Sequence, residues 1–329
     1  MKTINFAVGW PIKEGRELFL DALKAECKAR GLSFSVLYEE SLRRTKELVK
    51  RKKLMINFFL DMASETYNKE DEFTKFVYTL KDAGTVVVAD PDHVRFSADK
   101  AITHFNLMKA KVPVPFTIVI RNWEPTRRLT DEEKEHLGLP FVVKPGLGYG
   151  QQGVKIIRKR FSLKEIAQAR QFNVGDNFLL QEFIDPLLLG ETPAWFRVFH
   201  LFGEIFPCWW DPQTNGYRQV SLKEFVQYQL SALVQIVTKI ANITKIEWFS
   251  SEIAINAKTN KFVVVDYMND QCAMYPKSHH RDGVPDGLIV LIARRMVVRA
   301  WEYVRETFVM PHHAIWFPQE KANDESIQA

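Results

Sequence analysis

The chain has 329 residues, of which 46% are hydrophobic and 26% are charged, a balance that predicts a globular protein of two or three domains. Its net charge of +5 is too small to favour a nucleic-acid partner. The three cysteines are widely spaced and form no CxxC pair, so we expect neither a disulfide framework nor a cysteine zinc site, and a reducing, cytoplasmic setting is the simplest one.

The first 98 residues alternate strand and helix patterns. Short, almost entirely apolar strands are predicted at Ile4–Trp10, Leu32–Tyr38, Leu54–Leu60 and Thr85–Ala89, and helices at Gly15–Arg30, Ser41–Arg51 and Lys69–Ala83. Continuously apolar strands that alternate with helices are typical of a parallel sheet covered on both faces. We therefore expect an N-terminal α/β domain over residues 1–98, with its last strand stopped by Asp90-Pro91.

A different pattern follows over residues 99–184. A helix is predicted at Asp99–Lys111, followed by strands and a second, Ser-capped helix that together form a small α+β unit. The strands are Thr117–Arg121, Phe141–Lys144, Val154–Arg158 and Phe178–Glu182, and the second helix is Ser162–Arg170.

The remaining chain predicts a C-terminal subdomain over residues 185–318 and a disordered tail at 319–329. Its strands are expected at Phe196–Phe199, Glu204–Trp209, Glu252–Asn256 and Phe262–Tyr267, and its helices at Leu222–Ala241 and from Pro285 to about Thr307. The most apolar part of the last helix is interrupted by three arginines, so we expect no membrane span there.

The strongest local signal is a lysine at the end of a predicted strand, followed by four glycines within eight residues and then another strand. Glycines let backbone N–H groups approach an anion, and a lysine adds a positive charge for phosphate oxygens. A Walker loop would precede a helix, so this loop is of another kind, and a plain glycine-rich hairpin is the alternative. The residues assigned to phosphate binding here are Lys144, Gly146, Gly148, Gly150, Gln151 and Gly153.

Two weaker signals flank this loop. Lys100 opens a predicted helix, whose N-terminus offers backbone donors to an anion, although a surface lysine would look the same. The strand and linker after the loop offer backbone groups to an adenine ring, although taken alone they are better explained as a core strand. The candidate adenine-binding residues are Gln181, Glu182, Phe183 and Ile184.

An acidic hairpin supplies a fourth signal. Glu252 begins one strand and Asp266 ends the next, so antiparallel pairing across the turn between them brings the two carboxylates together. With the amide oxygen of Asn269 they would form an oxygen-rich site suited to Mg²⁺. The alternative is a surface hairpin with solvated acids.

These signals, in this order, resemble the ATP-grasp superfamily, which includes carboxylate–amine and carboxylate–thiol ligases such as D-alanine–D-alanine ligase, glutathione synthetase and ribosomal-protein glutamate ligase. The Val112–Thr117 lead-in and the strand that carries Arg197 are further matches, and the resemblance runs from Arg95 to Asn269. It implies the ATP-grasp fold: an N-terminal parallel-sheet α/β domain, a central α+β lid and a C-terminal antiparallel sheet.

The resemblance also implies residue roles. Lys100 and Lys144 would contact the α- and β-phosphates of ATP, and the glycine loop would close over them. Glu191, or alternatively Asp185, would bind the ribose. Arg197 would stabilise the transferred phosphate or the tetrahedral intermediate. One or two Mg²⁺ ions would be held by Glu252, Asp266 and Asn269.

Two positions depart from the superfamily pattern. The metal strand usually ends in an acid, any residue and asparagine, whereas here Asn269 follows Asp266 one residue later. Either a β-bulge returns Asn269 to the site, or Asp270 or another group completes the metal shell. Trp195 stands where the arginine strand often carries an acid, which leaves substrate recognition open.

The function implied is an ATP-dependent ligase that activates a carboxylate as an acyl phosphate and joins it to an amine or similar nucleophile. The alternatives are a small-molecule kinase, a peptide-modifying ligase and a non-catalytic binding protein. The expected partners are a small carboxylate and an amine, or a peptide, with no nucleic acid and no membrane. A homodimer is expected by analogy alone.

Two further segments carry no assigned role. The aromatic segment from Cys208 to Arg218 suits either an acceptor pocket, with Arg218 on a ring or carboxylate substrate, or an exposed loop anchored by two tryptophans. His279 and His280 suit either a general base or, with greater weight, a solvated loop.

Overall fold

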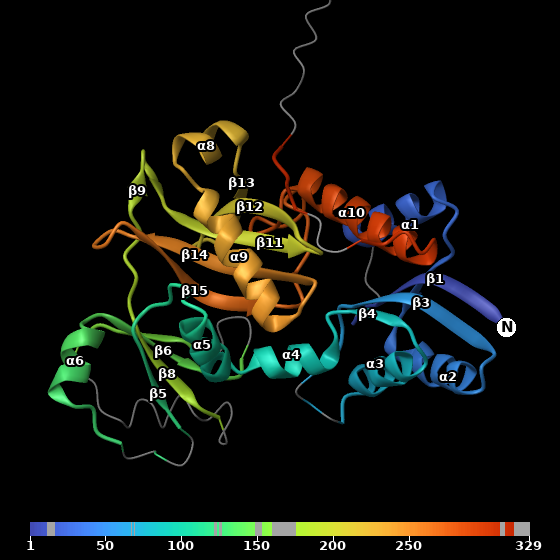
Figure 1. Cartoon of the computed structure of the whole chain (residues 1–329), viewed down its shortest axis with the longest axis horizontal. Helices are drawn as coiled ribbons and strands as arrows, with labels where there is room; N and C mark the ends of the chain where they lie inside the picture. Colours follow the sequence, from blue (N-terminus) through green and yellow to red (C-terminus); the bar gives the residue numbers. More distant parts are fainter. Residues whose placement is uncertain are drawn as a thin grey trace, which may run out of the picture.

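The structure is a computed structural model of the whole chain (Figure 1), and it describes residues 1–11, 17–66, 68, 70–121, 124, 127–148, 153–159, 176–309 and 313–318. Three sheets dominate these ranges: an N-terminal sheet, a lid sheet and a C-terminal sheet. The predicted helix Ser162–Arg170, the loop residues Gly150 and Gln151 and the predicted tail at 319–329 lie outside the described residues.

The N-terminal sheet is parallel throughout, in the order β2-β1-β3-β4, which confirms the predicted parallel α/β unit. Its strands are β1 (Lys2–Gly9), β2 (Phe34–Leu37), β3 (Leu54–Asp61) and β4 (Val86–Val88). The helices that alternate with them are α1 (Leu18–Ala29), α2 (Glu39–Lys50) and α3 (Glu72–Asp82). The helices α2 and α3 cover one face, where Phe59 and Phe76 pack edge to face.

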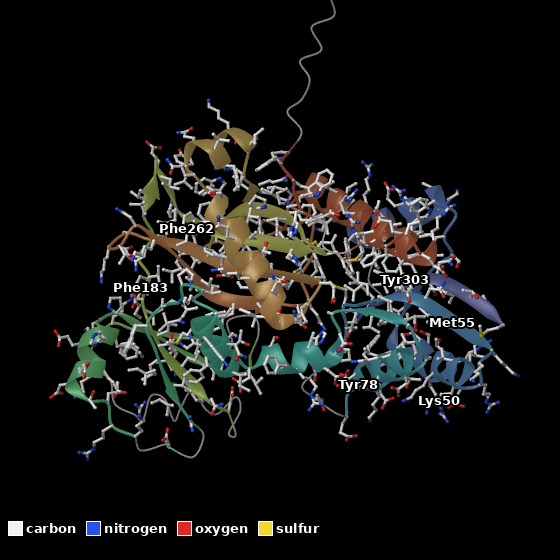
Figure 2. The ribbon with its side chains drawn as sticks, viewed as in Figure 1. Lys50, Met55, Tyr78, Phe183, Phe262 and Tyr303 are labelled. Atoms are coloured by element: carbon white, nitrogen blue, oxygen red, sulfur yellow. The ribbon has the colours of Figure 1, made fainter. Side chains whose placement is uncertain are left out.

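The other face of this sheet is covered by α1 together with a helix from the far end of the chain, α10 (Asp286–Val304), as Figure 1 shows. Tyr303 of α10 lies over the sheet (Figure 2), with its ring centroid 6.2 Å from that of Phe58. The N-terminal sheet therefore shares one hydrophobic core with the C-terminal part of the chain. Across the described ranges, every helix is too short or too polar to cross a membrane.

Two consecutive helices, α4 (Pro91–Ala98) and α5 (Lys100–Lys109), lead out of the N-terminal sheet. The strand β4 ends before Asp90-Pro91, as predicted. The same two residues also start the helix α4, which was not predicted. The Asp90 side chain accepts a hydrogen bond from the Asp92 amide, and proline fits the first helical position because it needs no N–H partner there.

The lid sheet is antiparallel in the order β5-β8-β6-β7. Its strands are β5 (Thr117–Ile120), β6 (Phe141–Pro145), β7 (Lys155–Ile157) and β8 (Phe178–Glu182). All four were predicted to within a few residues, whereas the helix α6 (Asp131–Leu137) was not. It begins with a capping box in which Thr130 and Glu133 each accept a hydrogen bond from the other's amide.

The C-terminal sheet runs β13-β12-β11-β14-β15, with antiparallel neighbours, and β16 adds to β12 in parallel. Its strands are β11 (Trp195–Leu201), β12 (Glu204–Asp211), β13 (Gly216–Gln219), β14 (Trp248–Asn256), β15 (Lys261–Asn269) and β16 (Ala314–Ile315). A short antiparallel pair, β9 (Leu188–Leu189) and β10 (Thr192–Pro193), precedes it.

The single helix predicted over Leu222–Ala241 is wrong. The chain forms two helices, α8 (Leu222–Gln227) and α9 (Ser231–Thr244), separated at Gln229, whose φ of 52° lies in the left-handed region. Helix α9 packs on the face of the C-terminal sheet opposite α10.

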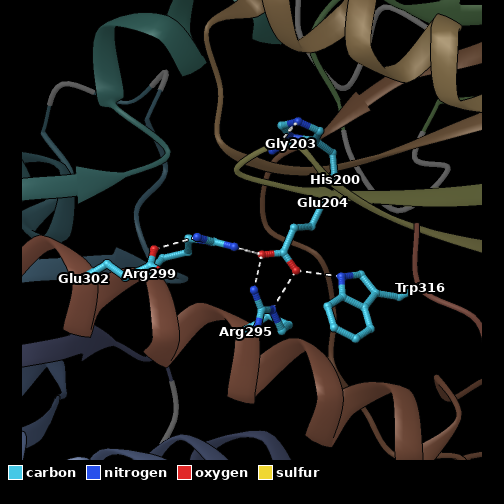
Figure 3. A network of polar contacts seen from close by, with 7 residues as sticks. All are labelled: His200, Gly203, Glu204, Arg295, Arg299, Glu302 and Trp316. Atoms are coloured by element: carbon cyan, nitrogen blue, oxygen red, sulfur yellow. Dashed lines mark hydrogen bonds and ion pairs between the residues drawn. The ribbon is translucent and has the colours of Figure 1, made fainter. Parts of the chain in front are cut away.

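A buried ion cluster connects β12 to α10 and to the end of the described chain (Figure 3). The Glu204 carboxylate is fully buried and accepts from Arg295 Nε at 2.7 Å, from Arg299 Nε at 3.0 Å and from Trp316 Nε1 at 2.6 Å. Arg299 also donates to Glu302. Ionised partners around one carboxylate offset the cost of removing it from water.

Replacing Glu204 with glutamine should lower the free energy of unfolding by about 3–5 kcal/mol, because two guanidinium groups then lose their buried partner. Urea unfolding followed by circular dichroism measures this. The exposed pair of Arg51 and Glu47, 3.7 Å apart, provides the control, and Glu47→Gln should leave the midpoint unchanged. Equal effects of the two substitutions would contradict a special role for the cluster.

Candidate nucleotide and metal site

A cavity of about 1430 Å³ opens between the lid sheet and the C-terminal sheet. Most of the residues singled out from the sequence line it, although they come from α5, both sheets and the β9–β10 turn. These are Lys100, Lys144, Gly148, Gln181, Glu182, Phe183, Ile184, Glu191, Glu252 and Asp266. Among the other described candidates, Gly146, Gly153, Arg197 and Asn269 do not line the cavity itself.

Lys144 reaches across the cavity from β6 to the C-terminal sheet. Its side chain is buried, and Nζ donates to the backbone oxygen of Val265 on β15 at 2.8 Å. The ammonium group also lies 5.2 Å from the ring centroid of Tyr267. Burial lowers the pKa of Lys144 to about 8, while the negative charge of Asp266 acts in the opposite direction.

Lys100 holds the start of the glycine loop. Its backbone N–H donates to the oxygen of Gly146 at 2.8 Å, and its Nζ donates to the oxygen of Gly148 at 2.7 Å. The loop is also held from the other side, because the Leu147 amide donates to the Asp176 carboxylate at 2.7 Å. A Cβ at Gly146 would lie 2.9 Å from that carboxylate and 3.1 Å from the Asn177 oxygen, so this position excludes a side chain.

The predicted adenine segment lies where the lid sheet meets the C-terminal sheet, as the position of Phe183 shows (Figure 2). The amide of Glu182 donates to the Phe116 oxygen at 2.9 Å, so this N–H is already used. Phe183 and Ile184 follow the end of β8 and line the cavity. Both ribose candidates, Glu191 and Asp185, line the same cavity, so their order stays a prediction.

The predicted pairing of the two acids is confirmed. Glu252 on β14 lies opposite Asp266 on β15, and Arg197 on β11 lies opposite Glu252. Arg197 Nη1 and Glu252 Oε1 are 3.4 Å apart. Three neighbouring strands thus place a guanidinium and two carboxylates side by side on one face of the sheet.

The two carboxylates differ in their electrostatic environment. Burial raises the pKa of Glu252, against the opposing effect of Arg197. Burial would also raise the pKa of Asp266, but three nearby cations, Lys100, Lys144 and Arg197, together lower it. Oδ1 of Asp266 is buried and has no hydrogen-bond partner among the described residues. An unpartnered carboxylate oxygen beside a second carboxylate fits a divalent cation.

A β-bulge, one of the two alternatives left open by the sequence, is present in this hairpin. Ser250 pairs with Asn269, while Glu252 pairs with Asp266, so one strand carries an extra residue between the two pairs. Whether the bulge delivers Asn269 to the metal site stays a prediction. No group of three or more His, Cys, Asp or Glu side chains in the described part of the chain is arranged as a complete metal site.

Arg197 is held in place by residues that the sequence analysis did not assign to it. Its Nε donates to Ser250 Oγ at 3.2 Å, and Nη1 donates to Tyr217 Oη at 3.3 Å. Its guanidinium carbon lies 5.0 Å from the ring centroid of Trp210. The side chain is thus fixed beside Glu252, whose charge raises the pKa of Arg197 against the effect of burial.

Tyr267 is a second residue that the sequence analysis missed. Its hydroxyl oxygen accepts from Gln181 Nε2 at 3.0 Å and lies 2.6 Å from His104 Nδ1. These contacts join β15 to β8 and to α5. Burial lowers the pKa of His104 to about 4, so the ring is neutral at pH 7. Its Nδ1 can therefore accept a hydrogen bond from the Tyr267 hydroxyl.

The structure places both segments that had no assigned role, the aromatic segment Cys208–Arg218 and the pair His279–His280. The aromatic segment after Cys208 forms the end of β12, an exposed turn and β13, so more of it is strand than the loop alternative expected, although the two tryptophans are buried as that alternative predicted. Arg218 lines the cavity and is paired with Glu224 at 2.7 Å. His279 and His280 are exposed and do not line the cavity, as the solvated-loop alternative predicted.

No protein-family model matches the sequence, and no curated protein does. Solved structures do match. D-alanine–D-alanine ligase from Bacillus anthracis, complexed with ATP, has a TM-score of 0.60 and 15% identity over 93% of this chain and 99% of that one. A RimK domain ATP-grasp protein from Sphaerobacter thermophilus has a TM-score of 0.57 and 17% identity over 89% and 99%.

A third match is the ATP-grasp ligase PsnB, complexed with a minimal precursor, Mg and ADP, with a TM-score of 0.53 and 11% identity over 88% of this chain and 98% of that one. At these identities the likeness shows the fold alone. The chain has the ATP-grasp fold, as the motifs predicted.

The buried His104 should make stability depend on pH. Between about pH 6.5 and 4 the unfolded chain binds a proton that the folded chain does not, so stability is lost as the pH falls through this window. Replacing His104 with glutamine should reduce the loss of unfolding free energy between pH 7.5 and 5 by about 2 kcal/mol. Urea unfolding at both pH values measures it, with exposed His279→Gln as the control. An unchanged loss in the His104 variant would show that the ring is not held neutral.

Proposed function

We propose that the chain is an ATP-dependent ligase that activates a carboxylate as an acyl phosphate and joins it to an amine or similar nucleophile. The observation that carries the proposal is that two lysines and two acids meet in one cavity of an ATP-grasp fold. These are Lys100, Lys144, Glu252 and Asp266. Mg-ATP would bind in this cavity between the lid sheet and the C-terminal sheet. The ATP and Mg recorded with similar structures support this placement.

The cationic side chains would hold the phosphates. Lys144 already lies buried between the two sheets, so a phosphate oxygen would replace the Val265 oxygen as its partner at little reorganisation cost. Lys100 would exchange its bond to the Gly148 oxygen for a phosphate contact. The exchange would free the loop that follows Lys144 to pack against the nucleotide and exclude water, which protects an acyl phosphate from hydrolysis.

The acids fit Mg²⁺. Glu252 and Asp266 lie opposite each other, and the unpartnered oxygen of Asp266 is a ligand without a present role. Asn269 is the proposed third ligand. A bound Mg²⁺ would neutralise the charge of the phosphate oxygens. It would also offset the charge of Asp266, which contributes to the raised pKa of Glu252.

The proposed chemistry has two steps. A substrate carboxylate oxygen attacks the γ-phosphorus and ADP leaves, which forms the acyl phosphate. The nitrogen of the second substrate then attacks the acyl carbon, loses a proton and expels phosphate. Arg197 lies beside Glu252 and would stabilise the oxygens that gain negative charge.

Hydroxylamine provides a test that does not require the natural amine. The purified chain is incubated with ATP, Mg²⁺, hydroxylamine and pools of carboxylic acids, and ADP and hydroxamate are measured. We expect both products in equal amounts, and only when a reactive acid is present. A stable phosphate ester of a hydroxy acid in place of hydroxamate would show a kinase, and nucleotide binding without any carboxylate-dependent turnover would contradict the ligase.

Replacing Asp266 with asparagine should lower carboxylate-dependent ADP formation by at least about 100-fold, because the group that would hold the cation loses its charge. The fold should persist, as circular dichroism would show. The matched control is Asp282→Asn on the exposed loop, which should keep full activity. Full activity of the Asp266 variant would refute its assignment as a metal ligand.

A further inference from the structure

Three rings form one wall of the cavity beside Arg197. Trp210 on β12 lies opposite Tyr217 on β13, with ring centroids 4.6 Å apart, and Trp195 precedes Arg197 by two residues on β11 and so faces the same side of the sheet. All three residues line the cavity, with Trp210 and Tyr217 only 6% and 8% exposed. Trp195, Trp210 and Tyr217 are called the aromatic wall below.

The cavity is larger than one nucleotide needs. Small-molecule sites are commonly about 300–1,000 Å³, whereas this cavity measures about 1430 Å³. Lys100 and Lys144, with the segment Gln181–Ile184, account for one part of its lining. The aromatic wall belongs to the other part, which is built from β11 and the β12–β13 hairpin. Under the proposed function this part would receive the carboxylate substrate.

The charges near the wall indicate how such a substrate would lie. Arg197 Nη2 has no hydrogen-bond partner within the described residues, although Nε and Nη1 do. This leaves a donor for a carboxylate or acyl phosphate oxygen. Arg218 also lines the cavity, but it is half exposed and paired with Glu224. Arg197 lies behind the residues that line the cavity, and its guanidinium carbon is 5.0 Å from the ring centroid of Trp210, so a carboxylate held at Arg197 would lie next to the aromatic wall.

The wall also contains an unmet polar group. The Trp210 N–H is buried and has no hydrogen-bond partner among the residues that the structure describes. Such a group costs about 1–3 kcal/mol when it stays unpaired. Phenylalanine at this position would fill space without that cost. The core residues Trp209 and Trp248 share this unpartnered state, and Trp210 differs from Trp248 in that it also lines the cavity, where an indole presents a broad ring.

We infer that the acid substrate carries an aromatic ring within a few bonds of its carboxylate, and that Trp195, Trp210 and Tyr217 select it. The carboxylate would contact Arg197, and the ring would pack against the wall. The inference rests on the proposed ligase function for the identity of the reacting acid. The selection of a ring by the wall can be measured separately as binding.

The test uses phenylacetate, cyclohexylacetate and acetate as probes. Their binding to the full chain is measured by calorimetry, with and without a non-hydrolysable ATP analogue and Mg²⁺. We expect phenylacetate to bind at least about tenfold more tightly than acetate, and severalfold more tightly than cyclohexylacetate, which has a ring of similar size without a π face. Equal affinities, or no binding of phenylacetate, would overturn the inference.

Substitutions locate the effect. Trp210→Leu should lower phenylacetate affinity about tenfold and leave acetate affinity unchanged, because acetate uses the Arg197 contact without the ring contact. The matched control is Trp301→Leu on α10, outside the cavity, which should change neither affinity. Trp195→Leu, at a partly exposed position, is the second variant if Trp210→Leu does not fold. A wall variant that folds and keeps the preference for phenylacetate would contradict selection by the wall.

The two proposals fail in different ways. If phenylacetate binds at the wall but yields no hydroxamate with ATP and hydroxylamine, and no other acid does, the ligase function fails while the aromatic subsite stands. If hydroxamate forms with acetate as efficiently as with phenylacetate, the ligase stands and the aromatic inference fails.

Discussion

The contact between the Lys144 ammonium and the C-terminal sheet is the interaction on which the site depends. A lysine is seldom fully buried without a partner, and this one is 6% exposed. Its charge is stabilised by the Val265 oxygen, by the ring of Tyr267 and by the nearby Asp266. Because the lysine belongs to the lid sheet and these groups belong to β15, the contact holds the two walls of the cavity together.

The opposite wall is organised by strand register. In an antiparallel sheet, residues directly opposite each other have side chains on the same face. This rule alone places Arg197, Glu252 and Asp266 in a row across β11, β14 and β15. The same face continues to Trp210 and Tyr217 on the β12–β13 hairpin. One sheet face therefore carries the proposed metal ligands, the proposed phosphate-stabilising cation and the aromatic wall in sequence.

The features that the sequence predicted well have local patterns. Apolar runs between helices identified the parallel strands, and the turn after Glu252 was enough to pair it with Asp266. Local rules failed where one signal has two meanings. The Asp90-Pro91 pair ends a strand and also begins a helix. The apolar spacing after Leu222 continued through Gln229, although the backbone there is left-handed and ends the helix.

Other features could not be predicted from the sequence, because they depend on contacts between distant parts of the chain. The hydrogen bond between His104 and Tyr267 joins residues 163 positions apart, and no short motif encodes it. The covering of the N-terminal sheet by α10 is similar, because more than half of the chain separates the helix from the last strand of that sheet. Glu204 looks like an ordinary strand residue until the fold brings Arg295 and Arg299 to it.

A structure with a non-hydrolysable ATP analogue and Mn²⁺ in place of Mg²⁺ tests the central claim most directly, because the anomalous signal of manganese locates the ion. We predict the adenine beside Phe183 and Ile184, the phosphates between Lys100 and Lys144, and the ion within bonding distance of Asp266. A nucleotide bound outside this cavity, or an ion bound away from Asp266, would contradict the account.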